Sequence, residues 1–147
     1  MPSGLGQLSS IERLYLSHNL LTGPFPADMV DMTTLVKLYL TGNLLEGPIP
    51  AGLEALAQLD VLFLNQNQFT GSIPLGVCSL RKLKYFSVSR TDISGHIPAE
   101  MSALTSLGYL YLWDTAMSGP LPPGLGALAP LRYFYCYATY LTGSLPD

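Results

Sequence analysis

A period of 24 residues runs through the whole chain and constrains its fold more than any other feature. Proline recurs at Pro2, Pro26, Pro50, Pro74, Pro98, Pro122 and Pro146, and glycine recurs at Gly23, Gly47, Gly71, Gly95, Gly119 and Gly143. Self-similarity at a fixed spacing of this size is typical of a solenoid, in which each repeat buries its apolar side only against its neighbours. We therefore interpret residues 1–147 as a single domain of six repeats.

Each repeat predicts the same succession of elements. The alternation apolar–x–apolar, as in Leu14-Tyr15-Leu16, predicts a short strand with one face buried. Because every repeat returns the chain to the same phase, these strands should be parallel and in register on the inner, concave curve. The glycine and the Pro-containing step after it predict a corner. A Leu-x-x-Leu spacing such as Leu53/Leu56 then predicts a short helical turn, often of the 3-10 kind, on the convex side.

The six copies resemble the plant-type leucine-rich repeat, LxxLxxLxLxxNxLxGxIPxxLxxL, of plant receptor-kinase ectodomains and polygalacturonase-inhibiting proteins. The copies begin at Leu5, Met29, Leu53, Val77, Met101 and Leu125, so the resemblance covers essentially the whole chain. It implies an α/β solenoid, a right-handed superhelix with a parallel β-sheet on the concave face and short 3-10 or helical turns on the convex face. It also implies a recognition module, most often for a protein or peptide.

The asparagine of this motif is present in only half of the copies. Its position is filled by Asn19, Asn43, Asn67, Thr91, Thr115 and Thr139. In the family the asparagine lies inside the turn, and its amide hydrogen-bonds backbone groups in a ladder from one coil to the next. Threonine has one hydroxyl and no amide, so we expect a shorter structural ladder, completed by buried water, in the last three copies.

Composition argues against several classes of function. Charged residues are only 12% of the chain and the net charge is -3, which gives no basic footprint for nucleic acid. We interpret the cluster Arg81, Lys82 and Lys84 as a solvated turn rather than a binding patch. The two histidines, His18 and His96, are far apart in repeat number, so we expect no metal site, no cofactor and no enzymatic activity.

The cysteines and the chain ends support further expectations. Two cysteines two repeats apart, Cys78 and Cys136, predict free thiols, with Cys136 at an inward strand position. No apolar run approaches the ~20 residues that cross a bilayer, and no signal peptide is evident, so the compartment is left open. No capping segment precedes Leu5 or follows Pro146, and we expect a longer parent chain or a partner that covers the end repeats. The resemblance implies a parent that is extracellular or attached to a membrane.

The aromatic residues predict a binding surface. Eight of the nine tyrosines and the only tryptophan occupy outward positions of the expected concave strands, and they become more frequent toward the C-terminal half. We predict a ligand-binding site on this face, with anchors at its centre and a rim around them. The anchors are Tyr109, Tyr111, Trp113, Tyr133 and Tyr135, and the rim is Tyr85, Arg90, Asp114 and Tyr137. The other interpretation of these columns is that stacked tyrosines only stabilise the sheet.

Binding of a protein or peptide is the first function that this pattern indicates. Carbohydrate binding, with cell-wall polysaccharide as the natural ligand, is the alternative, because Tyr and Trp also stack on sugar rings. A structural scaffold, as a subunit of a larger assembly, is a third interpretation. Ice binding ranks last, because it needs a flat threonine array on a surface and the threonines here point inward.

Overall fold

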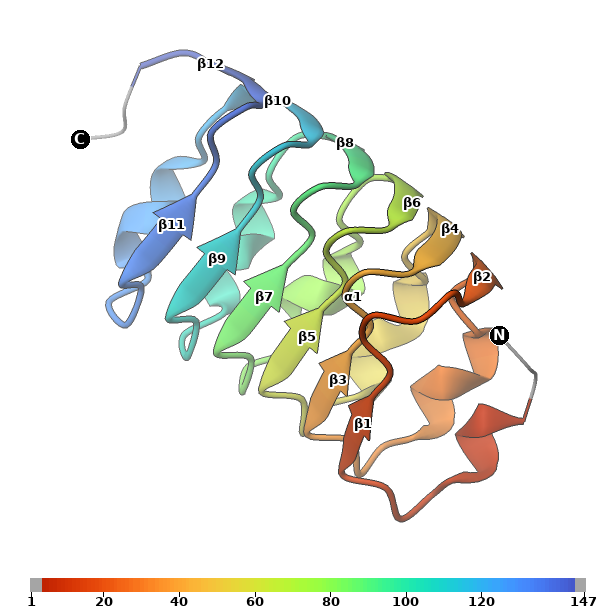
Figure 1. Cartoon of the computed structure of the whole chain (residues 1–147). Helices are drawn as coiled ribbons and strands as arrows, with labels where there is room; N and C mark the ends of the chain where they lie inside the picture. Colours follow the sequence, from red (N-terminus) through yellow and green to blue (C-terminus); the bar gives the residue numbers. More distant parts are fainter. Residues whose placement is uncertain (1–3, 145–147) are drawn as a thin grey trace.

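The concave face of the molecule is a six-stranded parallel β-sheet. In the computed structural model, which describes residues 4–144, its strands are β1 (Arg13–Tyr15), β3 (Lys37–Tyr39), β5 (Val61–Phe63), β7 (Tyr85–Ser87), β9 (Tyr109–Tyr111) and β11 (Tyr133–Tyr135). They lie side by side in chain order (Figure 1). Each residue pairs with its equivalent in the next repeat, as Leu14 does with Leu38. The predicted strands and their parallel register are confirmed, and we number the coils one to six by these strands.

A second six-stranded parallel sheet runs along the adjacent side of the solenoid. Its strands are β2 (Thr22–Pro24), β4 (Leu44–Pro48), β6 (Gln68–Gly71), β8 (Asp92–Gly95), β10 (Ala116–Pro120) and β12 (Tyr140–Thr142), again paired in chain order. The sequence predicted a corner here and no strand. The strands form because the turn after each concave strand leaves extended backbone next to the same segment of the neighbouring coil, where parallel hydrogen bonds satisfy its polar groups.

The convex side carries one short helical turn per coil, as expected. Five are 3-10 turns, η1 (Leu5–Gln7), η2 (Ala27–Asp31), η3 (Ala51–Ala55), η4 (Ala99–Ala103) and η5 (Pro123–Ala127), and one is a single α-turn, α1 (Leu75–Cys78). Every turn after η1 starts directly after the periodic proline, whose fixed φ holds the approach extended. No helix in the described part of the chain is long and apolar enough to span a membrane.

The apolar core is a strip enclosed by the two sheets and the convex turns. Leu62 of β5, Phe69 of β6 and Leu53 of η3 are fully buried, and equivalent positions in coils two to five repeat this pattern. Burial decreases at both ends of the strip. Leu14 of β1 is 9% exposed, and Phe134 of β11 is only partly buried. Each coil therefore depends on its two neighbours for its core, as expected for a solenoid.

Besides the periodic glycine, which also has a positive φ, one further residue in every coil adopts a left-handed backbone conformation. These residues are His18, Gly42, Gln66, Arg90, Asp114 and Ala138, with φ between 52° and 68°. Each directly precedes the Asn or Thr of the motif. This sharp bend turns the chain away from the concave strand and places the next side chain inside the coil. Only one of the six is a glycine, so residue type does not reveal the conformation in the sequence.

Candidate functional site

The aromatic residues predicted to form a site lie together on the concave sheet of coils four to six. In the first column Tyr109 stacks between Tyr85 and Tyr133, with ring centroids 4.4 and 4.8 Å apart. In the second column Tyr111 stacks on Tyr135 at 5.2 Å. In the third column Trp113 stacks on Tyr137 at 5.3 Å. We call these seven residues the C-terminal aromatic cluster.

The rings in this cluster face one another along the sheet. Their planes are inclined by only 9° for Tyr109 and Tyr133 and by 11° for Trp113 and Tyr137. The centroid separations match the ~4.8 Å spacing of neighbouring strands, so every ring of the cluster has at least one face covered by a ring of an adjacent coil. A ligand that approaches the concave face therefore meets ring edges and hydroxyl groups.

Solvent exposure increases across the cluster toward the C-terminal end. Tyr109, Tyr111 and Trp113 are half-buried, whereas Tyr133, Tyr135 and Tyr137 are 44%, 45% and 59% exposed. Burial, followed by the proximity of Tyr135 and other tyrosines, raises the pKa of the Tyr111 hydroxyl above its ordinary value. Tyr111 thus keeps its proton, and remains a hydrogen-bond donor, at neutral pH.

Some concave positions that the sequence placed on the surface are covered instead. Val61, Ser87 and Ser89 are 2%, 4% and 1% exposed, because short side chains on this curved sheet are shielded by longer neighbours. The covered positions separate the C-terminal aromatic cluster from a smaller N-terminal group. There Tyr15 stacks on Tyr39 at 4.8 Å and Phe63 meets Tyr39 edge-on at 5.3 Å.

The two charged residues predicted at the rim lie on neighbouring coils just after the concave strands. Arg90 Nε is 3.9 Å from Asp114 Oδ2, and both side chains are more than half exposed. An ion pair of this length at the surface contributes little to stability. Both groups are therefore free to exchange this contact for one with a ligand.

The buried asparagines of the motif connect adjacent coils. Asn67 Nδ2 donates to Leu64 O in its own coil at 3.0 Å and to Leu40 O in the preceding coil at 2.9 Å. The Leu45 amide in turn donates to Asn67 Oδ1 at 3.1 Å. Asn43 makes the equivalent three bonds. Asn19, in the first coil, is exposed and donates only within its own coil.

The threonines at the same position bond differently. Their hydroxyls donate to the carbonyl three residues earlier, from Thr91 to Val88, Thr115 to Leu112 and Thr139 to Cys136, at 2.6 to 2.7 Å. Within residues 4–144, none of these hydroxyls reaches another coil. The direct side-chain ladder thus joins coils one to three only.

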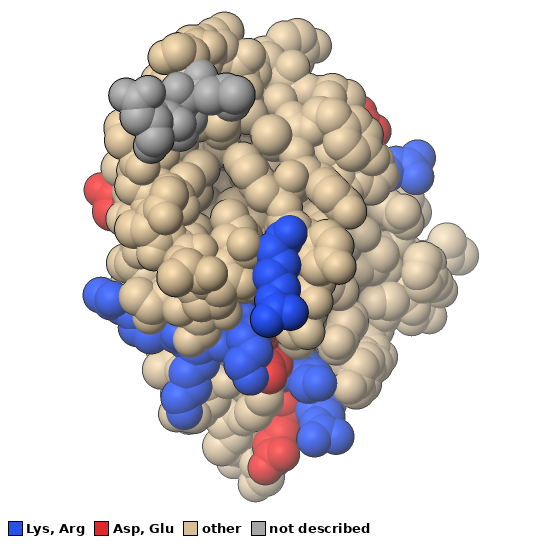
Figure 2. Space-filling model, turned by 90° about the vertical axis from the view of Figure 1, so that its left-hand side faces the viewer, with Lys and Arg blue, Asp and Glu red and all other residues tan. Residues whose placement is uncertain are grey.

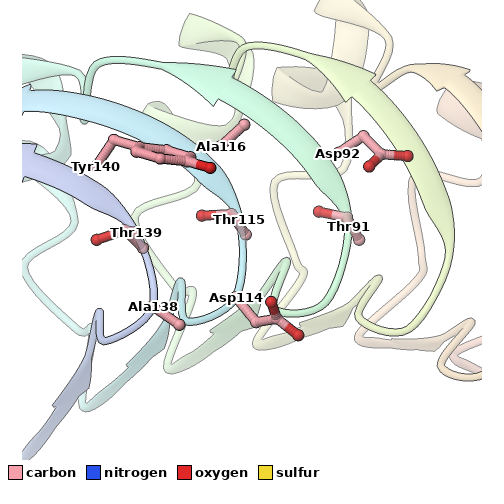
Figure 3. A pocket seen from close by; sticks show the side chains of 8 residues that line it. All are labelled: Thr91, Asp92, Asp114, Thr115, Ala116, Ala138, Thr139 and Tyr140. Atoms are coloured by element: carbon pink, nitrogen blue, oxygen red, sulfur yellow. The ribbon is translucent and has the colours of Figure 1, made fainter.

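An open groove of about 490 Å³ lies over these loops, and the sequence did not reveal it. It is lined by Thr91, Asp92, Asp114, Thr115, Ala116, Ala138, Thr139 and Tyr140. Figure 3 shows the threonines in one row on successive loops, with Asp92 and Tyr140 above them and Asp114 and Ala138 below. The groove follows the coils in which the asparagine is replaced, where the shorter threonine side chain fills less of the turn.

Both cysteines are free, as predicted. Burial of Cys78 in α1, with a smaller effect of Glu100, raises the pKa of its thiol to about 11. Burial likewise raises the pKa of the partly exposed Cys136. Both thiols are thus protonated and weakly nucleophilic at neutral pH. Among the described residues, no group of three or more His, Cys, Asp or Glu side chains could hold a metal ion.

Comparison with protein families matches the model described as Leucine Rich Repeat at residues 10–32, 34–56 and 58–80. These are the three copies that contain the motif asparagine. Comparison with curated protein sequences gives no match.

Similar solved structures include several plant receptors. The Arabidopsis receptor kinase HAESA, in complex with the peptide hormone IDA and the co-receptor SERK1, is 32% identical, with a TM-score of 0.97 over 100% of this chain and 25% of that one. A TDR receptor is 33% identical, with a TM-score of 0.95 over 97% of this chain and 25% of that one. The plant peptide hormone receptor RGFR1, in complex with RGF2, is 30% identical, with a TM-score of 0.95 over 97% of this chain and 23% of that one.

The chain spans about a quarter of the length of these receptors. A plant ice-binding protein, 24% identical with a TM-score of 0.89 over 96% of this chain and 46% of that one, shares the fold alone. The recurrent motif, the three matched Leucine Rich Repeat copies and the two in-register parallel sheets agree, and the chain is a leucine-rich repeat solenoid that is similar to these plant receptors.

Proposed function

We propose that this chain is a non-enzymatic recognition module that binds a protein or peptide segment through its C-terminal aromatic cluster. The observation that carries the proposal is the concentration of seven aromatic side chains, in three columns, on coils four to six of the concave sheet. Aromatic patches of this kind on a protein surface mark interaction sites, and Tyr and Trp are enriched among residues that dominate binding energy. The similar receptor HAESA was solved with the peptide hormone IDA, and the plant peptide hormone receptor RGFR1 was solved with RGF2.

The orientation of the rings favours a peptide over a carbohydrate. A sugar ring binds to an aromatic side chain by covering its face, and in this cluster most ring faces are already covered by the next coil. Ring edges and tyrosine hydroxyls remain, and these suit the amide groups and apolar side chains of an extended peptide. Tyr109 is stacked on both faces, and each of the other six rings of the cluster is stacked on one face only.

The same stacks also stabilise the sheet, so a test must separate binding from folding. Each stacked pair contributes ~0.5–1.5 kcal/mol beyond its buried area. Coils four to six lack the asparagine bridges between coils, so they depend more on these pairs. Alanine variants of the cluster should therefore be somewhat less stable, and binding has to be measured well below their unfolding temperature.

The experiment selects ligands from a display library of random linear peptides and then compares variants on the enriched peptides. Replacing Trp113 and Tyr111 together by Ala should weaken binding by at least about 30-fold, which corresponds to the ~2 kcal/mol typical of a central aromatic residue. The matched control, Tyr15→Ala with Tyr39→Ala, removes the N-terminal stack and should leave binding nearly unchanged. Fluorescence anisotropy of labelled peptides measures the affinity.

Two further outcomes separate the alternatives. Tyr111→Phe keeps the stack and removes the hydroxyl, so it should keep the unfolding temperature and weaken only peptides that bond this hydroxyl. If the library yields no binder, or if both alanine pairs reduce binding equally, the cluster is a stabilising element of the sheet and the proposal is wrong.

A further inference from the structure

Six of the seven Lys and Arg residues lie along one edge of the solenoid, where the chain enters the concave strands. They are Arg13, Lys37, Arg81, Lys82, Lys84 and Arg132, and only two acidic residues, Glu12 and Asp60, lie among them. Figure 2, viewed from the C-terminal end, shows most of the blue Lys and Arg side chains gathered in the lower half of the surface. The convex turns instead carry Asp28, Asp31, Glu54 and Glu100. The edge is therefore positive on a chain whose net charge is -3.

Two of these cations directly border the C-terminal aromatic cluster. The Gly108 amide donates to Lys84 O, and the Arg132 amide donates to Gly108 O, both at 2.9 Å. Lys84, Gly108 and Arg132 thus form one row across coils four to six. Each residue in this row immediately precedes the strand that begins with a tyrosine of the first column.

Gly108, the middle residue of this row, is itself buried between two positively charged neighbours. Gly108 has no side chain, and a Cβ there would have Pro130 O at 3.5 Å and Lys84 O at 3.8 Å as its nearest neighbours, which is ordinary contact. Lys84 and Arg132 are separated by two strand spacings, or ~10 Å. Both side chains are exposed and long enough to reach one group held between them at the surface.

Neither cation is strongly engaged within the chain. Lys84 Nζ is 3.8 Å from Asp60 Oδ2, and the Lys84 side chain is 58% exposed, which makes a weak pair. The Arg132 guanidinium is exposed and has no hydrogen bond or ion pair to any side chain in residues 4–144. Two available cations beside an aromatic surface are complementary to a carboxylate that is attached to an apolar or aromatic segment.

We propose that the peptide bound by the aromatic cluster is acidic, and that one of its carboxylates is bound between the exposed side chains of Lys84 and Arg132. This inference rests on the proposed function. Gly108, in the same row as these cations, directly precedes β9, and Trp113 lies five residues further along the chain, or ~16 Å in extended backbone. An extended ligand that contacts Trp113 therefore carries its acidic residue about five positions away.

The test uses the peptides enriched from the same library. They should contain Asp or Glu more often than the starting library, and replacing that residue by Gln or Asn should weaken binding about tenfold. Lys84→Gln combined with Arg132→Gln should cause a similar loss and make affinity less dependent on salt. The matched control is Arg13→Gln with Lys37→Gln, which removes two cations from the same edge beside coils one and two, and should have little effect. All four side chains are at the surface, so unfolding temperatures should not change.

The outcomes distinguish this inference from the function on which it rests. Neutral or basic enriched peptides, or unchanged affinity of the Lys84/Arg132 variant for peptides that still require Trp113 and Tyr111, would overturn the acidic-ligand inference alone. Loss of all peptide binding would overturn both. A last measurement uses vesicles of anionic phospholipid. If the protein bound these vesicles through Lys84 and Arg132 and bound no peptide, the positive edge would be a membrane-binding surface, and the inference would also be overturned.

Discussion

At the scale of single residues, the left-handed position in each coil is where the fold acts against the preference of the amino acid. Five coils place a side chain at φ between 52° and 57°. This conformation costs roughly 1–2 kcal/mol for a residue other than glycine. The bend is imposed by the hydrogen bonds on both sides of it, such as His18 N to Thr41 O at 2.7 Å, and these offset the cost.

Gly42, the one glycine at this position, provides a direct measure of the cost. Gly42→Ala should lower the free energy of unfolding by ~1–2 kcal/mol, because alanine is strained at φ 68° and its Cβ would lie 2.7 Å from His18 Nδ1. The control is Gly52→Ala in η3, where the nearest atom to the new Cβ, Val30 Cγ1, is 3.7 Å away. Urea denaturation should find the control unchanged or more stable. Equal losses for the two variants would show that the left-handed bend is not the cause.

At the scale of elements, the sequence predicted what the 24-residue period marks with residue type. The concave strands and convex turns follow from alternating and Leu-x-x-Leu spacing, and the aromatic columns follow from the register of those strands. The second sheet did not follow, because most of its strands contain Gly or Gly-Pro, residues that are depleted in strands. Lys84 and Arg132 come from positions two coils apart, so their neighbourhood depends on the coil geometry, and sequence analysis treated Lys84 as part of a solvated turn.

The asparagine bridge is the element whose energetic role can be isolated best. Asn67→Thr should remove the bonds to Leu40 O and from the Leu45 amide, since threonine at this position bonds only within its coil. Because these groups are buried, the free energy of unfolding should fall by about 2–3 kcal/mol. Chemical denaturation measures this loss.

A control and a reverse substitution test the explanation. Asn19→Thr removes no bond to another coil and is exposed, so it should cost much less than Asn67→Thr. Thr91→Asn places an amide where it can reach Leu64 O and the Phe69 amide, by analogy with Asn67, and should stabilise the protein by ~1 kcal/mol. If Asn19→Thr and Asn67→Thr had equal effects, the bridges between coils would not be the source of the loss.

At the scale of the whole molecule, two kinds of contact between coils stabilise opposite ends of the solenoid. Asparagine bridges join coils one to three, and the larger set of aromatic stacks joins coils four to six. In a solenoid each coil is stabilised by its own contacts and by those to its nearest neighbours. The buried bridges and the fully covered core are in the first half and the centre, whereas the stacks lie on the surface.

This arrangement predicts an asymmetric pattern of native-state hydrogen exchange. Amides of β5, in a coil bridged by asparagine and with Leu62 fully buried, should exchange only through global unfolding. Amides of β9 should exchange about tenfold faster, because coil five lacks the bridge, which is worth roughly 1–2 kcal/mol. Amides of β11, where Phe134 is only partly buried, should exchange fastest among the concave strands. Thr91→Asn should slow exchange in coils three and four and leave β11 unchanged. Protection that falls equally from the centre toward both ends would mean that burial alone sets local stability, and that the aromatic stacks fully replace the missing bridges.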